Sequence, residues 1–491
     1  MSDEMISFGA KLAQNAATQG QRPAVSCGEE TLTYAELHRR TNRLARGLAA
    51  KGVKAGDLVT VGLQNGVGFV EACHAIWKLG ATPQPVSFRL PKAELQAIIE
   101  LAKAPLVIAD FEHQVDRPVM GVAEIAALGD SDADLPDAIP PISKAPTSGG
   151  STGRPKLILA GQPGLAPRET PEAAGFRIRA GETMLLPAPL YHNAPFGMMM
   201  TGTAMGCHVV LTPRFDPEGT LAEIQQRKAS WVYLVPTMMN RIWRLPGEVK
   251  SRYDLSGVET LWHMAAPCPD WLKEAFIRWI APGEVMELYA GTEAQAVTII
   301  TGTEWLEHRG SVGRVVIGEM KVVGEDGRDL PPGEVGEIYM RRAPGQPETY
   351  RYVGATPRTL PDGWESLGDM GWFDADGYLY LADRRADMIL VGGSNVYPAE
   401  IEAALQEHPA VESCAVIGLP DDDLGARIHA IVKAREAVSE EALQAHLADR
   451  LVSYKRPRTF EFVDEPVRDD AGKVRRTALR EARLKPQGQP A

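Results

Sequence analysis

A glycine- and hydroxyl-rich segment at residues 147–156 carries the strongest chemical signal in the chain. It holds three glycines, four hydroxyl side chains and two cations within ten residues. Glycines let backbone N–H groups turn toward an anion, hydroxyls add donors and cations neutralise charge, so the segment suits a polyphosphate. The GxxxxGK[ST] spacing of the P-loop is absent. By composition alone, a flexible linker fits as well, although the ending Pro155-Lys156 argues against one.

Further motifs follow along the chain in a defined order. They are residues 31–37 (TLTYAEL), 191–195 (YHNAP), 265–267 (AAP), 289–293 (YAGTE), 368–369 (GD) with 383–384 (DR), and 471–476 (AGKVRR). Together with TSGGSTGRPK at 147–156, they resemble the signatures of the adenylate-forming superfamily. That superfamily includes acyl-CoA synthetases, peptide-synthetase adenylation domains and firefly luciferase, and the resemblance to acyl-CoA synthetases covers nearly the whole chain.

The resemblance implies a nucleotide site in which Tyr289 stacks on adenine and Glu293 ligates Mg²⁺, a hard cation that prefers oxygen ligands. Asp369 would bind the ribose hydroxyls. The residues implied for ATP or AMP binding are Thr147, Ser148, Gly149, Gly150, Ser151, Thr152, Gly153, Lys156, Ala265, Ala266, Pro267, Tyr289, Ala290, Gly291, Asp369 and Arg384. Outside this context, Thr-Glu is more often a helix start, and such an Asp is an ordinary turn residue.

The resemblance also implies a catalytic set and a channel for the acceptor thiol. The catalytic residues are Lys473, Glu293, Thr292 and His192. A lysine can stabilise charge on the reacting carboxylate and α-phosphate. Gly392 and Gly393 would line the coenzyme A channel, since a narrow tunnel needs backbone without side chains. Solvated lysines and glycine turns before a helix are the alternatives.

Apolar, pliant residues lie near motifs that the family uses to line its acyl pocket. The pocket residues implied are His192, Asn193, Phe196, Gly197, Trp231 and Met264. They favour a medium- or long-chain, alicyclic or aromatic acid. Methionine-rich stripes are more often plain core, and His192 equally suits a hydrogen-bonded core position. No carboxylate stands where an amino acid's ammonium would be held, which disfavours amino-acid activation.

Several positions depart from the family pattern. Gly150 replaces a usual hydroxyl residue, Leu157 replaces a common glycine, and Ala386 occupies the usual hinge position. Residues 468–470 (RDD) precede Lys473 where Arg-Thr and a small residue are common, and the two acids could hold Lys473 in an ion pair. None of these changes removes a reacting group.

Alternating helix and strand patterns must position these motifs. Residues 34–48 and 67–79 have the apolar spacing of helices, and 58–61 and 106–109 that of buried strands. A hairpin is expected at 320–340, where Asp326-Gly327 supplies turn residues. We predict an α/β fold: a large N-terminal domain of wound α/β subdomains plus a β-barrel-like part, with a small mobile α+β C-terminal domain.

The predicted domains are an N-terminal AMP-binding domain at 1–383, a hinge at 384–387 and a mobile domain at 388–491 that carries Lys473. The mobile domain has the pattern strand, helix, strand, strand, helix and basic tail. In the family this domain is thought to rotate between two reaction steps, which would withdraw the lysine.

Composition narrows the function classes. A chain of 491 residues with 44% apolar content predicts several domains. No apolar run suits an integral membrane segment and the start lacks a signal-peptide pattern, so we expect a cytoplasmic protein. The net charge of -12 disfavours nucleic acid as a partner. The five scattered cysteines support neither a disulfide framework nor a zinc site.

We therefore interpret the chain as an acid–thiol ligase. A carboxylic acid and ATP, with Mg²⁺, would give an acyl-adenylate and pyrophosphate, and the acyl group would pass to coenzyme A with release of AMP. Fatty acid metabolism is an expected setting, and a homodimer an expected assembly. Two alternatives stay open: delivery to a carrier-protein thiol or an amine, and a nucleotide-binding sensor that has lost catalysis.

Overall fold

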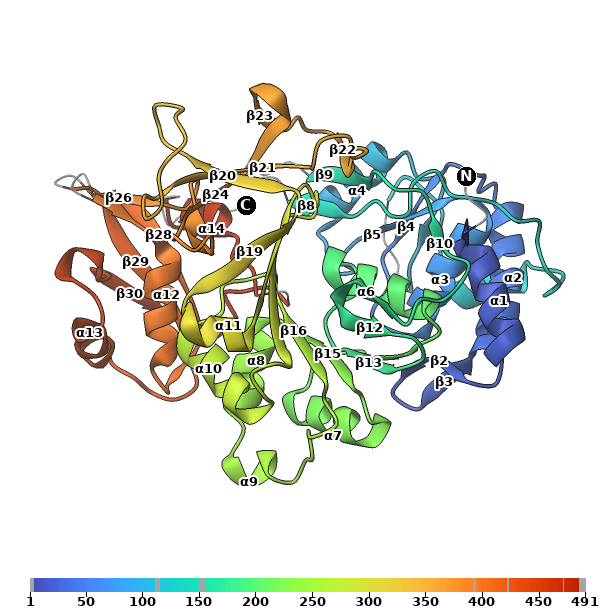
Figure 1. Ribbon diagram of the computed structural model, residues 1–491, viewed down its shortest axis with the longest axis horizontal. Helices are drawn as coiled ribbons and strands as arrows, with labels where there is room; N and C mark the ends of the chain where they lie inside the picture. Colours follow the sequence, from blue (N-terminus) through green and yellow to red (C-terminus); the bar gives the residue numbers. More distant parts are fainter. Residues whose placement is uncertain are drawn as a thin grey trace.

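The computed structural model describes residues 4–110, 115–149, 155–391, 394–421, 424–470 and 472–484. In Figure 1, the first part of the chain lies at one end of the molecule, and most of the chain after residue 387 lies at the other. The strands between them cross the middle. No helix of the described chain is long and apolar enough to cross a membrane.

A large twisted sheet organises the molecule, and half of it is parallel. Its parallel strands, in spatial order, are β2 (Pro23–Cys27), β14 (His208–Leu211), β13 (Thr183–Leu186), β15 (Trp231–Leu234), β16 (Thr260–His263) and β17 (Val285–Tyr289). The antiparallel strand β3 (Glu30–Thr33) ends the sheet beside β2. Nearly all side chains of these parallel strands are buried, because helices cover both faces.

The sheet continues beyond β17 as antiparallel strands. They are β18 (Val297–Thr301), β19 (Ser311–Ile317), β25 (Leu379–Arg384), β24 (Trp364–Phe373), β21 (Gly336–Arg341) and β20 (Glu319–Val323), with β23 (Arg358–Leu360) on β24. The predicted hairpin is confirmed as β20 paired with β21. The hydrogen-bonded path runs from β20 to β3 without closing through the described strands, so the part expected to be barrel-like is an open sheet.

Two smaller sheets complete the large domain. One is parallel, with strands β5 (Thr82–Pro85), β4 (Leu58–Val61), β6 (Val107–Ile108) and β7 (Val119–Met120). The other is antiparallel, with strands β22 (Tyr350–Val353), β9 (Pro155–Ala160) and β8 (Thr147–Gly149). Short pairs are formed by β1 (Met5–Ser7) with β10 (Leu165–Pro167) and by β11 (Ala173–Ala174) with β12 (Ile178–Arg179).

Helices pack on these sheets. They are α1 (Phe8–Gln19), α2 (Tyr34–Ala50), α3 (Val67–Lys78), α4 (Lys92–Ala102), α5 (Val122–Ala127), α6 (Asn193–Ala204), α7 (Pro217–Arg227), α8 (Pro236–Trp243), α9 (Gly247–Lys250), α10 (Asp270–Trp279) and α11 (Gly302–Glu307). Helix α2 begins where predicted, because Thr33 and Glu36 form a reciprocal capping box there. Its apolar face, including Leu37, Leu44 and Leu48, is buried.

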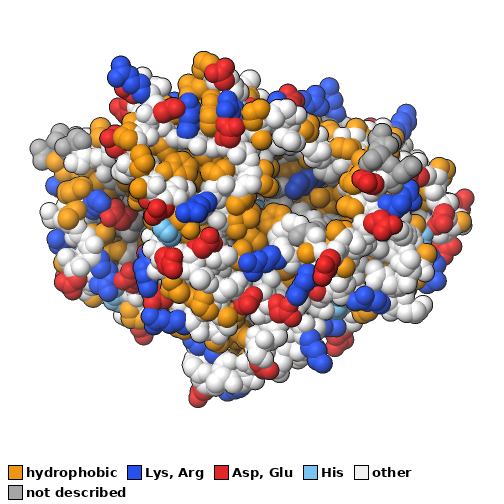
Figure 2. Space-filling view, in the orientation of Figure 1, with side chains coloured by type: hydrophobic (Ala, Val, Ile, Leu, Met, Phe, Trp, Pro, Cys, Tyr) orange, Lys and Arg blue, Asp and Glu red, His pale blue; other side chains and the backbone are white. Residues whose placement is uncertain are grey.

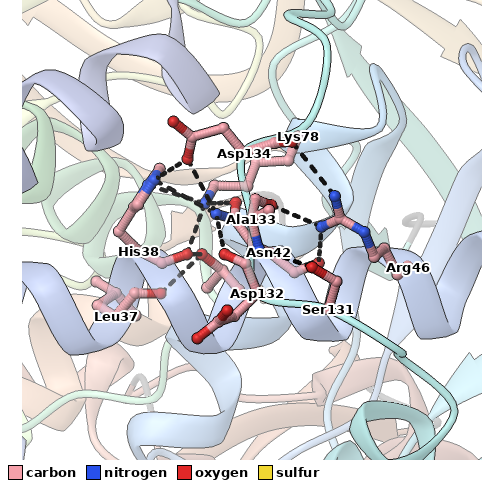
Figure 3. Close-up of polar contacts among 10 residues, drawn as sticks. Leu37, His38, Asn42, Arg46, Lys78, Ser131, Asp132, Ala133 and Asp134 are labelled. Atoms are coloured by element: carbon pink, nitrogen blue, oxygen red, sulfur yellow. Dashed lines mark hydrogen bonds and ion pairs between the residues drawn. The ribbon is translucent and has the colours of Figure 1, made fainter.

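An acidic stretch at residues 130–134 is tied to α2 and α3 (Figure 3). The Asp134 carboxylate accepts hydrogen bonds from His38 at 2.6 Å and from Asn42 at 3.2 Å. Asn42 also donates to the carbonyl of Asp132, and the Lys78 ammonium donates to the carbonyl of His38 at 2.8 Å. These groups satisfy one another's hydrogen bonds: Lys78 donates to His38 and Asn42, and these two residues bond to the acidic stretch.

The chain after residue 387 has a hydrophobic core of its own, which includes Ile401, Leu405, Val416 and Val432. Its elements are β26 (Ile389–Val391), β27 (Ser394–Val396), α12 (Pro398–Glu407), β28 (Val411–Asp421), β29 (Gly425–Ala434), α13 (Glu440–Ala448), β30 (Thr459–Phe462) and α14 (Arg476–Leu484). The basic tail forms α14, a helix that the sequence pattern did not predict. The predicted fold class is confirmed.

Candidate active site

The carboxyl ends of β16 and β17 bring several motif residues to one edge of the large sheet. The Tyr289 hydroxyl, at the end of β17, donates to Asp369 at 2.7 Å. Asp369 lies opposite Arg384 in the pairing of β24 with β25, which joins the GD and DR motifs. The side chain of Arg384 lies outside the described part. Parallel strands present their ligand-binding loops at this edge.

The segment after β16 has a strained backbone. Ala265 has φ of 80°, a left-handed conformation that favours glycine. Such strain persists where the surrounding structure fixes it, often at a functional site. Ala266 follows, and its side chain lies close to Gly472 of the tail motif. A Cβ placed on Gly472 would lie 3.5 Å from the Cβ of Ala266 and 3.0 Å from Cγ2 of Thr237.

Glu293 is 5% exposed and has two partners from the antiparallel sheet. Its Oε1 atom lies 3.3 Å from the ammonium of Lys156 and accepts a hydrogen bond from the hydroxyl of Tyr352. The same ammonium lies 3.9 Å from the centre of the Tyr352 ring. Burial and the bond to Glu293 raise the pKa of Tyr352, so the phenol keeps its proton. The pairing of β22 with β9 places Tyr352 beside Lys156.

The turn from Tyr289 to Glu293 depends on a glycine. A Cβ on Gly291 would lie 2.2 Å from Cδ1 of Leu367 and 2.8 Å from Oε2 of Glu293. Ala290 and Thr292 flank it in the same turn. Within the described chain no side chain donates to Oε2 of Glu293, so this oxygen can face a cation. One carboxylate oxygen, completed by phosphate oxygens and water, fits a Mg²⁺ site.

The loop that carries Lys473 is held from inside its own domain. The backbone N–H of Lys473 donates to the Asp469 carboxylate at 2.9 Å, and Arg468 donates to the Gly472 carbonyl at 2.9 Å. Arg468 also pairs with Glu402, a carboxylate that is nearly buried in α12. Asp469, one of the two acids expected beside Lys473, thus binds the lysine's backbone.

Two ion pairs connect this loop to the large domain. Asp470 lies 2.9 Å from the guanidinium of Arg89, and their side chains are 42% and 52% exposed. Arg475 lies 3.3 Å from Glu94 in helix α4, and both partners retain solvent contact. Exposed pairs of this kind contribute about 0–1 kcal/mol each. These two ion pairs between the loop and the large domain are therefore individually weak.

His192 stands at the start of α6 near the same loop, and its side chain makes no capping hydrogen bond. Burial lowers its pKa to about 3, with a further lowering by the charge of Lys473 and a smaller opposing effect of Asp470. The imidazole is therefore neutral near pH 7. Its Nε2 atom and the Oδ1 atom of Asn193 are buried and find no hydrogen-bond partner in the described chain. Polar atoms in this state favour a ligand at the first turn of α6.

The residues assigned to the acyl pocket separate into two groups. His192, Asn193 and Gly197 lie on α6 at or near the edge, and Met264 follows β16. Phe196 is fully buried and packs on Phe69 and Trp77. Trp231 stands at the amino end of β15, where its indole donates to the Phe176 carbonyl at 2.8 Å. The structure does not bring Phe196 and Trp231 to the edge.

The phosphate loop itself is only partly described. Thr147, Ser148 and Gly149 form β8, and Ser148 pairs with Lys156 of β9. Gly150, Ser151, Thr152 and Gly153 lie outside the described residues, as do Gly392 and Gly393 of the predicted channel. Figure 2 shows a face on which hydrophobic side chains gather near the middle, where the surface is hollowed.

Sequence reasoning missed three residues that the structure connects to this edge: Tyr352, Arg89 and Glu402. Tyr350 and Tyr352 alternate with Arg351 on one strand, a period-2 signal that could have predicted β22 but not its partner. Arg89 and Glu402 gave no local signal, because their partners lie far away in the sequence.

Comparison with known proteins agrees with this geometry. Residues 12–346 match the family described as AMP-binding enzyme, and residues 400–473 match the AMP-binding enzyme C-terminal domain. A feruloyl-CoA synthase from Amycolatopsis sp is 34% identical over 93% of this chain and 95% of the relative. A 2-succinylbenzoate–CoA ligase from Geobacillus kaustophilus is 32% identical over 96% of each chain.

A solved structure has the same fold. The o-succinylbenzoate coenzyme A synthetase from Bacillus subtilis, in complex with ATP and magnesium ion, superposes with a TM-score of 0.80 at 26% identity. The match covers 96% of this chain and 98% of that one.

Proposed function

Because this chain belongs to the AMP-binding enzyme family, we propose that it is an ATP-dependent, AMP-forming acid–thiol ligase whose acceptor is coenzyme A. The carrying observation is that Gly472, next to Lys473, lies close to Ala266, and that the charge of Lys473 acts on His192, so the lysine loop stands near the edge that also holds Glu293 and Asp369. A cation, a buried carboxylate and a ribose-binding pair at one edge are what acid adenylation needs.

In the first half-reaction, an oxygen of the acid's carboxylate bonds to the α-phosphorus of ATP, and the bond from that phosphorus to pyrophosphate breaks. Lys473 stabilises the negative charge that both reactants bring to the reaction centre. Lys156 and Tyr352 fix the carboxylate of Glu293 in place. Magnesium, held by Glu293 together with the phosphates, would neutralise charge there.

In the second half-reaction, the sulfur of coenzyme A bonds to the acyl carbon, the bond from that carbon to AMP breaks, and the thiol proton goes to solvent. We infer that the small domain turns between the steps, with 1–383 and 388–491 as domains and 384–387 as the hinge. Gly392 and Gly393 then line the thiol channel. The exposed pairs of Asp470 and Arg475 suit this movement, since they can break at little cost.

An aromatic acid is the substrate class we favour. The two relatives above are named for feruloyl and 2-succinylbenzoate groups, each built on an aromatic ring. The rings of His192 and Tyr191 have centroids 4.5 Å apart and are tilted by 48°, and such a pair of flat side chains suits an aromatic acid. A fatty acid, a cytoplasmic location and a homodimer remain predictions of the sequence.

Incubation with ATP, Mg²⁺ and a panel of aryl, alicyclic and fatty acids, with and without coenzyme A, tests the proposal. We expect an acyl-adenylate without coenzyme A and an acyl-CoA with it, both detected by mass spectrometry. Adenylate without any thioester would favour a carrier-protein thiol or an amine as acceptor. If no acid released pyrophosphate across the panel, the ligase assignment would be wrong, and the nucleotide-binding sensor would replace it.

A further inference from the structure

Lys144 lies just before β8, and backbone hydrogen bonds fix this part of the chain in the interior. Its carbonyl accepts from the N–H of Ala160 at 3.0 Å, and the next N–H, of Ala145, donates to the carbonyl of Pro83 at 3.1 Å. The indole of Trp77 donates to the carbonyl of Ser143 at 2.8 Å. Lys144 is thereby fixed between β5, β9 and α3, where the neighbouring residues Ser143 and Ala145 are buried.

The ammonium of Lys144 reaches helix α6. A Cβ added to Gly197 would lie 3.3 Å from Nζ, so the glycine leaves room for the amine. Desolvation lowers the pKa of Lys144 to about 8, and no neighbouring charge of the described chain contributes. The residue as a whole is half-buried. The surroundings of this amine beside Gly197 are called the recess below.

One face of α6 connects this recess to the reaction edge. Asn193, Gly197 and Met200 are spaced four and three residues apart, so they share a face. All three are half-buried, whereas Phe196 and Met199 between them are fully buried. The unpartnered Oδ1 atom of Asn193 stands at the start of this face. The rise from Asn193 to Gly197 is about 6 Å, which suits a substituted aromatic ring.

We propose that Lys144 is a specificity-determining residue: it binds an oxygen-bearing group, a carboxylate or a phenolic hydroxyl, at the far end of the acid substrate. A buried ammonium without an anionic partner is costly, and such a group would supply one. The acid would lie along α6 with its reacting carboxylate near His192 and its second oxygen group at Lys144. This inference rests on the proposed function and adds the substrate's second polar end.

Matched acids that differ only at the far end test the proposal. Cinnamate, 4-hydroxycinnamate and 4-carboxycinnamate are compared by pyrophosphate release, and their binding is measured separately by calorimetry. We expect the wild type to favour at least one of the substituted acids over cinnamate about tenfold in kcat/KM, as charge-assisted hydrogen bonds allow. Comparison of 4-carboxycinnamate with 4-hydroxycinnamate shows which oxygen group is bound.

In Lys144→Met, the ratio of kcat/KM for the substituted acid to that for cinnamate should fall to about one. The charge is removed, whereas the apolar part of the side chain remains. Gly197→Ala places a methyl group 3.3 Å from Nζ and should reduce the preference without removing the amine. Lys51→Met, at an exposed lysine far from the recess, is the matched control and should keep the wild-type ratio.

A ratio kept by Lys144→Met would overturn the proposal, as would a wild type that does not favour either substituted acid. If no acid is turned over, the proposed function fails and the binding data decide the role of Lys144. A binding preference that is lost in Lys144→Met then supports the role, and equal or absent binding refutes it.

Discussion

Two sides of the candidate site are held in different ways. Glu293 is buried, and its partners Lys156 and Tyr352 belong to the same domain. The loop of Lys473 reaches the site from the small domain through ion pairs of Asp470 and Arg475, whose side chains are exposed. Buried, mutually satisfied groups are costly to disrupt, whereas exposed ion pairs are not.

In the proposed mechanism, this difference separates the part of the site that stays fixed from the part that can leave. A site that must bind nucleotide in both half-reactions benefits from a rigid carboxylate. A lysine that serves one half-reaction benefits from contacts that break easily. The fixed side and the movable side can therefore be challenged by separate variants.

The largest effect is expected at the fixed side, from Glu293→Gln. The amide removes the magnesium ligand's charge and leaves the Lys156 ammonium without its carboxylate, so adenylation should fall by about 10²–10³-fold. Pyrophosphate release at saturating acid, with ATP and Mg²⁺ varied, measures it. Glu365→Gln is the matched control, because Glu365 accepts from Tyr350 as Glu293 accepts from Tyr352. An equal loss in both variants would argue against a special role for Glu293.

The second largest effect is expected from acidic pH, which should lower the free energy of unfolding through His192. Burial lowers the pKa of His192 to about 3, while the unfolded chain has an ordinary histidine pKa near 6.5. The unfolded state therefore binds more protons below pH 6.5, and stability falls as pH falls through that range. His192 should lower the free energy of unfolding by about 2 kcal/mol at pH 5.

The thermal midpoint Tm at pH 7 and pH 5 checks this. The decrease in Tm from pH 7 to pH 5 should be smaller for His192→Asn than for the wild type. An identical loss in the variant would mean that His192 takes up its proton as readily when folded.

On the movable side, Gly472→Ala should cost about tenfold in adenylation. Gly472 has φ of 76°, and a Cβ there would meet Thr237 at 3.0 Å. The left-handed backbone adds roughly 1–2 kcal/mol for a residue with a Cβ. Gly327→Ala is the control, since Gly327 has φ of 80° and nothing within 4 Å of an added Cβ. Activity lost in both would point to unfolding.

The smallest effect is expected from the pair Arg89–Asp470. Replacing either residue by Ala should slow adenylation only a few-fold, and the double variant should show a coupling of about 0.2–1 kcal/mol. The coupling should fade in high salt, because both groups are exposed. A coupling that persisted in 1 M salt, where the screening length is about 3 Å, would show that the loop is held more rigidly.

Local patterns predicted much of this fold. The start of α2 follows from the capping box of Thr33 and Glu36, and α12 begins at Pro398, a favoured first residue of a helix. Helix α14 was missed because, among the described residues of the helix, Leu479 alone packs on the small domain's core, so its apolar signal was short.

The site was predicted as a set of motifs but not as a set of contacts. The order of the motifs indicated Tyr289 and Asp369 together, and their hydrogen bond agrees with that grouping. Tyr352 and Lys144 lie in no motif. Tyr352 reaches the site because β9 pairs with β22, and the amine of Lys144 reaches Gly197 of α6. Such neighbours come from strand pairing between distant segments, which a local pattern does not encode.

The central claim, that the lysine loop serves one half-reaction and can leave in the other, is tested most directly with Lys473→Ala. Adenylation from acid and ATP is measured by pyrophosphate release, and thioester formation is measured from supplied acyl-adenylate and coenzyme A. The account predicts a loss of about 100-fold or more in the first rate, as for removal of one charge-stabilising group, and a change of only a few-fold in the second. Equal losses in both rates would contradict it, because the lysine would then be required at the site throughout.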